Sequence, residues 1–267
     1  MKIAAVQMVS GTDPEQNSAT AQRLIQEAAH AGAELVVLPE YFCAMGRSDR
    51  DKLGLAETPG DGPLQQMLSD TAREHGIWLI GGTLPIRTDD PDRVLNANCV
   101  YAPDGSLAVR YDKIHLFKYE TERDHYDEGR TIRAGDGPTA FQAGALKVGL
   151  SVCYDLRFPE LYRALMHPPC DLISVPAAFT YPTGLAHWEL LLRARAVENQ
   201  CYVIAAAQGG QHENGRRTFG HSMVVDPWGQ VLNVLPEGEG VVLAELDLAR
   251  IAQVREQLPA LQHRTLS

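Results

Sequence analysis

Short apolar runs rich in valine and isoleucine recur along the chain and alternate with segments of helical periodicity. Residues 34–38 and 201–207, for example, are apolar almost throughout, which is typical of strands buried on both faces of a sheet. Such strands need helices on either side, so the alternation predicts an α/β fold. Because no low-complexity linker divides the chain, we expect one domain over residues 1–267, built from two similar halves.

The predicted elements follow from apolar periodicity and from the proline, glycine and aspartate residues that mark their ends. We expect strands at 2–9, 34–38, 77–82, 95–102, 107–111, 146–152, 171–175, 201–207 and 240–246. We expect helices at 14–32, 63–75, 159–167, 187–199 and 247–257. Residues 112–145 form a long connection with many charged and aromatic residues, and connections of this length within a domain usually carry function.

Composition excludes several classes of protein. The net charge of −10 argues against a nucleic acid partner. No apolar run approaches the length of a membrane span, and the N-terminus resembles a strand rather than a signal peptide. The five cysteines are widely spread, with neither a CxxC pair nor a zinc-type spacing. We therefore expect a cytoplasmic protein without membrane attachment.

The apolar run at 146–152 ends on Cys153, and Arg157 follows four residues later. Because Pro159 fits the first turn of a helix, the thiol is expected at the end of a strand, beside free backbone N–H groups. A nearby positive end favours the thiolate, which is the nucleophilic form of cysteine. A cysteine after an apolar run is also a common core residue, so this segment alone leaves both interpretations open.

Two further residues that could take part in catalysis follow predicted strands in the same way. Glu40 comes just after the strand at 34–38, and a carboxylate in a partly apolar pocket can act as a general base near neutral pH. Lys113 comes just after the strand at 107–111, where it can stabilise a thiolate or an oxyanion. Folds of the α/β class place their sites at the carboxyl ends of strands. Taken singly, a helix cap and a solvated lysine remain the alternatives.

Together these three segments resemble the Glu, Lys and Cys motifs of the nitrilase superfamily of carbon–nitrogen hydrolases. The segments are Leu38-Pro39-Glu40, Tyr111-Asp112-Lys113-Ile114-His115-Leu116-Phe117 and Cys153-Tyr154-Asp155-Leu156-Arg157-Phe158-Pro159-Glu160. Their order and spacing agree with the family, and the resemblance covers essentially the whole chain. It implies a four-layer α-β-β-α sandwich that usually assembles as a dimer.

The resemblance also implies what each residue does. Glu40 is the general base, and Cys153 is the nucleophile that forms a thioester with the substrate. Lys113 and the backbone N–H of Tyr154 stabilise the tetrahedral oxyanion. This chemistry requires no metal and no organic cofactor.

A second carboxylate is implied in the long connection, where it would orient Lys113 or the attacking water. Glu128 matches that position best. Asp127, Glu122 and Glu120 lie close enough in the sequence to remain alternatives.

Residues 179–229 resemble the branch of the superfamily that hydrolyses deaminated glutathione to 2-oxoglutarate and cysteinylglycine. A neighbouring branch that acts on 2-oxoglutaramate shares part of the pattern, and both substrates are small amides that carry a carboxylate. Arg157 is our candidate for binding that carboxylate, because guanidinium matches it bidentately. An ion pair with Asp155 or Glu160 is the alternative. The remaining candidates line the substrate pocket, and they are Tyr41, Phe117, Tyr154, Phe179 and Thr183.

Two other functions remain open on the sequence. His187 and His221 suggest a Cys–His hydrolase, although histidines in such positions more often cap or pack. A catalytically silent binding protein of the same fold is the second alternative, and the intact set of Glu40, Lys113 and Cys153 argues against it. Residues 212–217 are predicted to form an exposed loop that borders the site.

Overall fold

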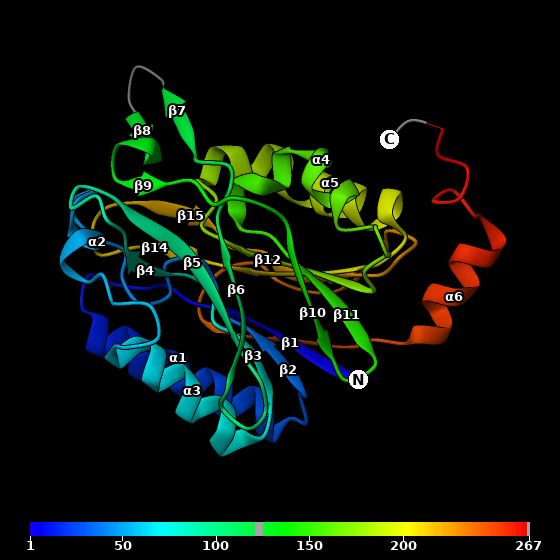
Figure 1. Cartoon of the computed structure of the whole chain (residues 1–267), viewed down its shortest axis with the longest axis horizontal. Coiled ribbons are helices and arrows are strands. Elements are labelled where there is room, and N and C mark those ends of the chain that lie inside the picture. The colour runs from blue at the N-terminus through cyan, green and yellow to red at the C-terminus, as the bar shows by residue number, and fades with distance from the viewer. Residues whose placement is uncertain (121–124, 266–267) are drawn as a thin grey trace.

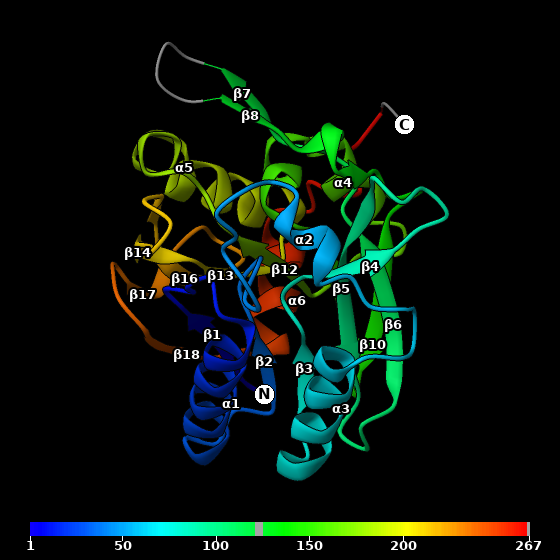
Figure 2. The same cartoon turned by 90° about the vertical axis from the view of Figure 1, so that its left-hand side faces the viewer.

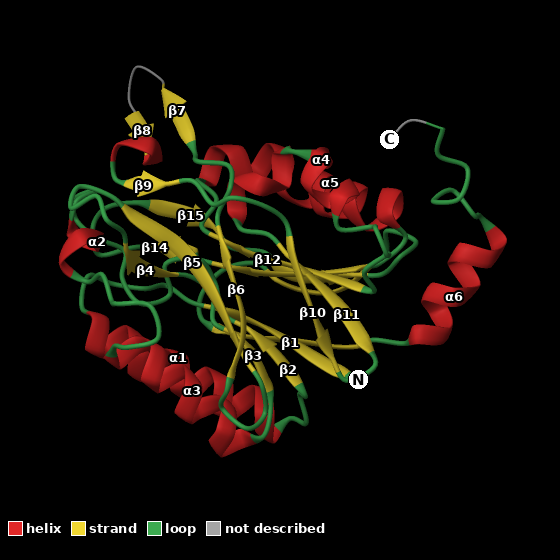
Figure 3. Ribbon diagram, viewed as in Figure 1, coloured by secondary structure: helices red, strands yellow, loops and turns green. Residues whose placement is uncertain are grey.

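Two β-sheets lie face to face at the centre of the protein, and helices cover the outer face of each sheet (Figure 1, Figure 3). The structure, a computed structural model, describes residues 1–120 and 125–265. Its layers follow the order helix, sheet, sheet, helix. This is the four-layer α-β-β-α sandwich that the sequence resemblance implies.

The first sheet contains eight strands and has a parallel core. Along the sheet, the order is β18 (Gly240–Glu245), β1 (Lys2–Gln7), β2 (Leu35–Val37), β3 (Trp78–Ile80), β5 (Val94–Tyr101) and β4 (Leu84–Arg87), with β6 (Leu107–Asp112) and β9 (Ile132–Arg133) also paired to β5. Strands β1, β2 and β3 run parallel, and the pairs β18–β1 and β3–β5 are antiparallel.

The second sheet contains six strands and repeats this plan. Its order is β10 (Thr139–Ala143), β11 (Leu146–Leu150), β12 (Leu172–Ala177), β13 (Tyr202–Ala207), β16 (Ser222–Val225) and β17 (Val231–Leu235). Strands β11, β12 and β13 are parallel, and antiparallel strands flank them. Two hairpins lie outside the sheets, namely β7 (Lys118–Glu120) with β8 (His125–Asp127) and β14 (Gly209–Gln211) with β15 (Arg217–Phe219). The two similar halves that the sequence predicts are therefore present.

The helices lie outside the two sheets. They are α1 (Pro14–His30), α2 (Asp51–Gly54), α3 (Pro63–His75), α4 (Pro159–Ala164), α5 (Tyr181–Asn199) and α6 (Leu248–Gln257), with short 3₁₀ segments η1 (Glu128–Arg130) and η2 (Cys153–Arg157). Helices α1 and α3 lie side by side on the first sheet (Figure 2), while α4 and α5 cover the second (Figure 1). Within residues 1–120 and 125–265, no helix is both long enough and apolar enough to cross a membrane.

Strand β1 shows why its sequence is apolar on both faces. Ile3 and Ala5 point into the core between the sheets, where the second sheet contributes Val148. Ala4 and Val6 belong to a separate core beneath α1 and α3. Because side chains alternate along a strand, a buried central strand needs apolar residues at every position.

The predicted elements are largely confirmed, with two corrections. The helix predicted over 187–199 begins at Tyr181. Residues 181–186 contain a proline and a glycine and so resemble a loop, but they form the start of this helix. Pro182 fits the helix start, and a Cβ on Gly184 would lie 2.2 Å from the Cβ of Phe219, so glycine allows close packing there. The connection at 112–145 contains β7, β8, η1, β9 and β10 and is not an irregular loop.

Candidate active site

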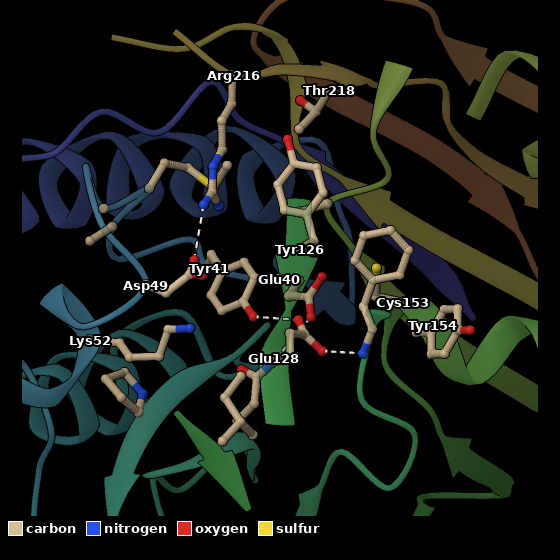
Figure 4. A pocket seen from close by; sticks show the side chains of 18 of the residues that line it. Glu40, Tyr41, Asp49, Lys52, Tyr126, Glu128, Cys153, Tyr154, Arg216 and Thr218 are labelled. Carbon is tan, nitrogen blue, oxygen red and sulfur yellow. Dashed lines mark hydrogen bonds and ion pairs between the residues drawn. The ribbon is translucent and has the colours of Figure 1, made fainter. Parts of the chain in front are cut away.

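Glu40 and Cys153 approach each other from the two sheets and face one pocket (Figure 4). Glu40 follows β2 by three residues, and Lys113 directly follows β6, so both come from the first sheet. Cys153 follows β11 of the second sheet and begins η2. The structure thus brings together the three residues that the sequence singles out.

Lys113 lies between two carboxylates. Its Nζ is 2.9 Å from Oε1 of Glu40 and 2.8 Å from Oε2 of Glu128. The Lys113 side chain is fully buried, and that of Glu40 is 1% exposed. Cys153 lies beside Glu40 and faces the same pocket. Lys113, Glu40 and Glu128 therefore form one continuous buried network, with the thiol of Cys153 next to it.

Glu128 is the acid of the long connection that contacts Lys113. Asp127 is directed elsewhere, with Oδ2 3.6 Å from the ammonium of Lys118. Glu120 lies on β7 and is exposed. Glu122 lies outside the described residues. Of the described alternatives, Glu128 has the position expected of the second carboxylate.

Neutral donors fix the orientation of both carboxylates. The amide of Asn96 donates to Oε1 of Glu40 at 2.9 Å. The hydroxyl of Tyr41 donates to Oε1 of Glu128 at 2.7 Å, and the backbone N–H of Phe117 donates to Oε2 at 2.7 Å. Sequence reasoning missed Asn96, because it lies in the middle of an apolar strand with no motif around it.

The surroundings shift the pKa values of the two carboxylates in opposite directions. Burial raises the pKa of Glu40 and outweighs the opposite effect of Lys113. Burial also favours the protonated form of Glu128, but Lys113 and the surrounding donors keep the pKa of Glu128 below its usual value. Glu128 is thus the permanent counter-ion of Lys113, while Glu40 is better suited to exchange a proton.

The pKa values of Cys153 and Lys113 are shifted as well. Burial raises the pKa of the Cys153 thiol well above its usual range, and the charge of Glu40 adds to this effect. Burial alone would lower the pKa of Lys113, but Glu128 and Glu40 raise it well above its usual value. These shifts favour a protonated thiol on Cys153 and a charged ammonium on Lys113.

Cys153 adopts a strained backbone conformation, with a φ of +49°. Few residues other than glycine occupy this region, and those that do often belong to functional sites. Asp155 stabilises the turn, because its buried carboxylate accepts from the N–H of Val152 at 2.8 Å, from the hydroxyl of Tyr111 at 2.7 Å and from the N–H of His115 at 3.0 Å.

Arg157 lies on the pocket wall and forms neither of the ion pairs considered as alternatives. In the described part of the chain, no carboxylate lies within 4.0 Å of its guanidinium. It instead contacts Nδ1 of His187 at 3.2 Å and lies 5.3 Å from the ring centroid of Phe179 and 5.8 Å from that of Tyr154. Its charge is available to a ligand.

All the predicted pocket residues line the same cavity as Cys153. These are Tyr41, Phe117, Tyr154, Arg157, Phe179 and Thr183. The cavity also contains polar residues that sequence reasoning missed, namely Asp49, Lys52, Asn96 and Thr218. Lys52 and Asp49 lie in a charged stretch that resembles ordinary surface.

The residues behind the alternative functions have other partners. His187 is exposed on α5 and contacts Arg157, whereas His221 stacks on Phe219 with 4.0 Å between ring centroids. The loop predicted at 212–217 borders the pocket through Arg216 and Arg217. His212 is buried, contrary to the prediction, because its ring bonds the carbonyl of Ser10 and the hydroxyl of Thr218.

Of the other four cysteines, Cys43 lines the same pocket as Cys153, whereas Cys99, Cys170 and Cys201 do not. Burial raises the pKa of Cys43 and of Cys99 to about 12 and that of Cys170 to about 11. Cys201 is fully buried and its pKa is also raised by burial. In the part of the chain that the structure describes, no cluster of His, Cys, Asp and Glu side chains could hold a metal ion.

Comparison with known proteins agrees with this geometry. A family model described as carbon-nitrogen hydrolase matches residues 2–256. Deaminated glutathione amidase from Yersinia enterocolitica is 40% identical over 266 residues, which span 98% of this chain and 92% of the relative. Omega-amidase NIT2 from Mus musculus is 38% identical over 264 residues, or 98% and 94% of the two chains. The crystal structure of the C. elegans NitFhit protein has a TM-score of 0.91 at 40% identity, and the match covers 99% of this chain and 65% of that one. The chain belongs to the carbon–nitrogen hydrolase family.

Proposed function

We propose that the protein is a thiol-dependent amidase that hydrolyses deaminated glutathione to 2-oxoglutarate and cysteinylglycine. The observation that carries the proposal is the buried network of Glu40, Lys113 and Cys153 beside an arginine without a carboxylate partner. The first part supplies the chemistry of amide cleavage. The second supplies recognition of a substrate carboxylate, and a deaminated glutathione amidase is among the relatives.

Acylation begins with the thiol. Cys153 attacks the amide carbonyl while Glu40 takes the thiol proton, so a C–S bond forms as the carbonyl becomes an oxyanion. Lys113 and the backbone N–H of Tyr154 stabilise that oxyanion, and one such donor typically contributes about 3 kcal/mol. Glu40 then returns the proton to the leaving nitrogen, the C–N bond breaks, and the amine departs from a thioester.

Deacylation reverses these roles with water. Glu40 takes a proton from the attacking water as the water oxygen bonds the thioester carbon. The C–S bond then breaks, the carboxylic acid is released, and the proton returns to the sulfur of Cys153. Glu128 keeps Lys113 charged and oriented throughout, since both of its oxygens lie within 3.0 Å of the ammonium. A catalytically silent protein would have no need of this costly buried charge arrangement.

Substrate recognition rests on Arg157. Its guanidinium lies over the rings of Tyr154 and Phe179, so it is held in place while its hydrogen-bonding edge stays available. We expect it to bind the carboxylate of the 2-oxoglutaryl group. The substitution Arg157→Lys should weaken binding of carboxylate-bearing amides and spare neutral ones, whereas an equal loss on both would contradict this role.

Omega-amidase activity is the second candidate, because the mouse omega-amidase is nearly as similar to this chain. The two activities share the acyl group and differ in the leaving amine. The decisive measurement is kcat/KM on deaminated glutathione and on 2-oxoglutaramate. A preference of a hundredfold or more for 2-oxoglutaramate, on the order of 3 kcal/mol, would overturn our first choice.

We also propose that the protein forms a homodimer through α5. Leu190 is 67% exposed and Val197 is 48% exposed, and both lie on that helix. The turn that carries Trp228, 55% exposed, packs beside Val197. Exposed apolar groups of this kind mark association surfaces. Sedimentation velocity should give a dimer that Leu190→Glu dissociates, and a wild-type monomer would contradict the proposal.

A cytoplasmic location completes the proposal. Its support is that Cys43, Cys99, Cys153, Cys170 and Cys201 are all free thiols, as is usual in a reducing compartment. Fractionation of the source cells tests it, and recovery of the protein in an extracytoplasmic fraction would contradict it.

A further inference from the structure

Beyond the catalytic network, four cationic side chains line the pocket in the described part of the chain, and only two of them have a carboxylate partner. Arg216 lies 3.1 Å from Asp49, and Arg217 lies 2.8 Å from Glu237. Neither Lys52 nor Arg157 has a carboxylate within 4.0 Å among the described residues. Since Arg157 is already assigned to the acyl group, Lys52 is the cation without a role.

Lys52 is held in the pocket wall by weak partners. It lies on α2, and its ammonium donates to the hydroxyl of Thr131 at 3.2 Å. It lies 5.8 Å from the ring centroid of Tyr41. Burial lowers the pKa of Lys52, and the more distant Glu128 and Asp49 offset this only in part. An ammonium with two donor hydrogens to spare in such a place gains from an anionic ligand.

The position of Lys52 defines which part of the substrate it meets. Tyr41 lies between it and the catalytic network, because the Tyr41 hydroxyl bonds Glu128. Arg157 lies at the other side, over Tyr154, the neighbour of Cys153. Figure 4 shows Lys52 and Asp49 on one side of the pocket and Cys153 and Tyr154 on the other. An acyl group bound at Arg157 would leave the Lys52 side of the pocket open to the leaving amine.

We propose that Lys52 determines specificity by binding a carboxylate on the leaving amine. It thereby favours amides of a small peptide with a free C-terminus over amides of ammonia. This inference rests on the proposed function and adds the residue that selects between its two candidate substrates. In deaminated glutathione, the carboxylate in question is that of the glycyl residue.

The test compares three substrates with wild-type enzyme and with Lys52→Met, which keeps the aliphatic stem and removes the charge. The substrates are deaminated glutathione, the same compound with its glycyl carboxylate converted to an amide, and 2-oxoglutaramate. A charged hydrogen bond lost from a pocket weakens binding substantially. We expect KM for deaminated glutathione to rise about tenfold to a hundredfold with little change in kcat. For the other two substrates, the variant and the wild type should agree within about threefold.

Arg50→Met is the matched control. It removes the same charge two residues away, from an exposed side chain that pairs with Asp92 at 2.7 Å, and it should leave all three substrates unaffected. Retained activity on 2-oxoglutaramate shows that Lys52→Met is folded.

The remaining outcomes separate the two proposals. An equal loss on all three substrates, or no loss on any, overturns the role of Lys52 and leaves the proposed function intact. Wild-type enzyme that cleaves 2-oxoglutaramate but not deaminated glutathione overturns the proposed function, and the role of Lys52 with it.

Discussion

The inner and outer ends of the pocket differ in how their charges are satisfied. At the inner end, Lys113 contacts Glu40 and Glu128, and each carboxylate also accepts from a neutral donor. At the outer end, Lys52 has one hydroxyl partner and lies near the half-buried ion pair of Arg216 and Asp49. The inner end is organised before the substrate arrives, which suits chemistry, while the outer end has bonding capacity left over, which suits recognition.

The largest effect should come from the nucleophile. Cys153→Ala removes the atom that forms the thioester, so we expect kcat to fall by about 10⁴-fold or more. Steady-state kinetics measures the loss, and intact-protein mass spectrometry of the wild type should detect an acyl adduct on Cys153. Cys43→Ala is the control, because Cys43 is a buried thiol that lines the same pocket and should be dispensable. Hydrolysis retained by Cys153→Ala would refute the mechanism.

The general base should come next. Glu40→Gln preserves the shape of the side chain and removes proton transfer, which typically contributes 10²–10⁴-fold, so we expect kcat to fall by about 10³-fold. Glu40 must be ionised to act, and burial raises its pKa above the usual value of a glutamate. Wild-type kcat/KM should therefore decline on acidification at a higher pH than an unperturbed glutamate would give.

The substitution Glu128→Gln should distinguish the role of Glu128 from that of Glu40. Because Glu128 raises the pKa of Glu40, its neutralisation should shift the acid limb of kcat/KM to lower pH. It should also lower kcat by about 10²-fold, since Lys113 loses a charged partner. A pH profile over the acid range measures both effects. An acid limb that stays in place would mean that another group controls it.

A smaller effect is expected from the neutral donor to Glu40. Asn96→Ala leaves the carboxylate without one hydrogen bond, and we expect kcat to fall by about tenfold while KM changes little. Asn98→Ala is a matched control, because Asn98 lies two residues along the same buried strand and its side chain has no hydrogen-bond partner among the described residues. Equal losses in both variants would point to strand packing instead.

The smallest effect should come from Tyr41→Phe. The ring remains and only the hydroxyl that donates to Glu128 is lost. Since Glu128 keeps the N–H of Phe117 and the ammonium of Lys113, we expect kcat to fall about threefold to tenfold. Steady-state kinetics with calorimetry as a folding check measures this. A loss as large as that of Glu128→Gln would make the hydroxyl part of the catalytic chemistry.

Sequence reasoning reaches the inner end of the pocket better than the outer end. Glu40, Lys113 and Cys153 are recognisable because each follows an apolar strand and carries a motif. Asn96 carries no such signal, since its amide matters only through a contact with Glu40, 56 positions away. Lys52 lies among arginines and aspartates that resemble a solvated surface, and only the fold shows that α2 turns it inward.

Helix boundaries, too, can be predicted where the signal is local and are missed where a distant contact sets them. The predicted helix over 63–75 coincides with α3, whose start and end carry local signals in Pro63 and Gly76. The beginning of α5 is missed because Gly184 serves a contact with Phe219 that local sequence does not reveal.

The catalytic residues are divided between the two sheets, so enzymatic activity requires that both sheets have folded and docked. Glu40 and Lys113 follow strands of one sheet, and Cys153 follows a strand of the other. A molecule in which either half has formed alone contains every catalytic side chain and no catalytic site. During refolding, recovery of amidase activity should therefore date the docking of the sheets, later than the return of secondary structure.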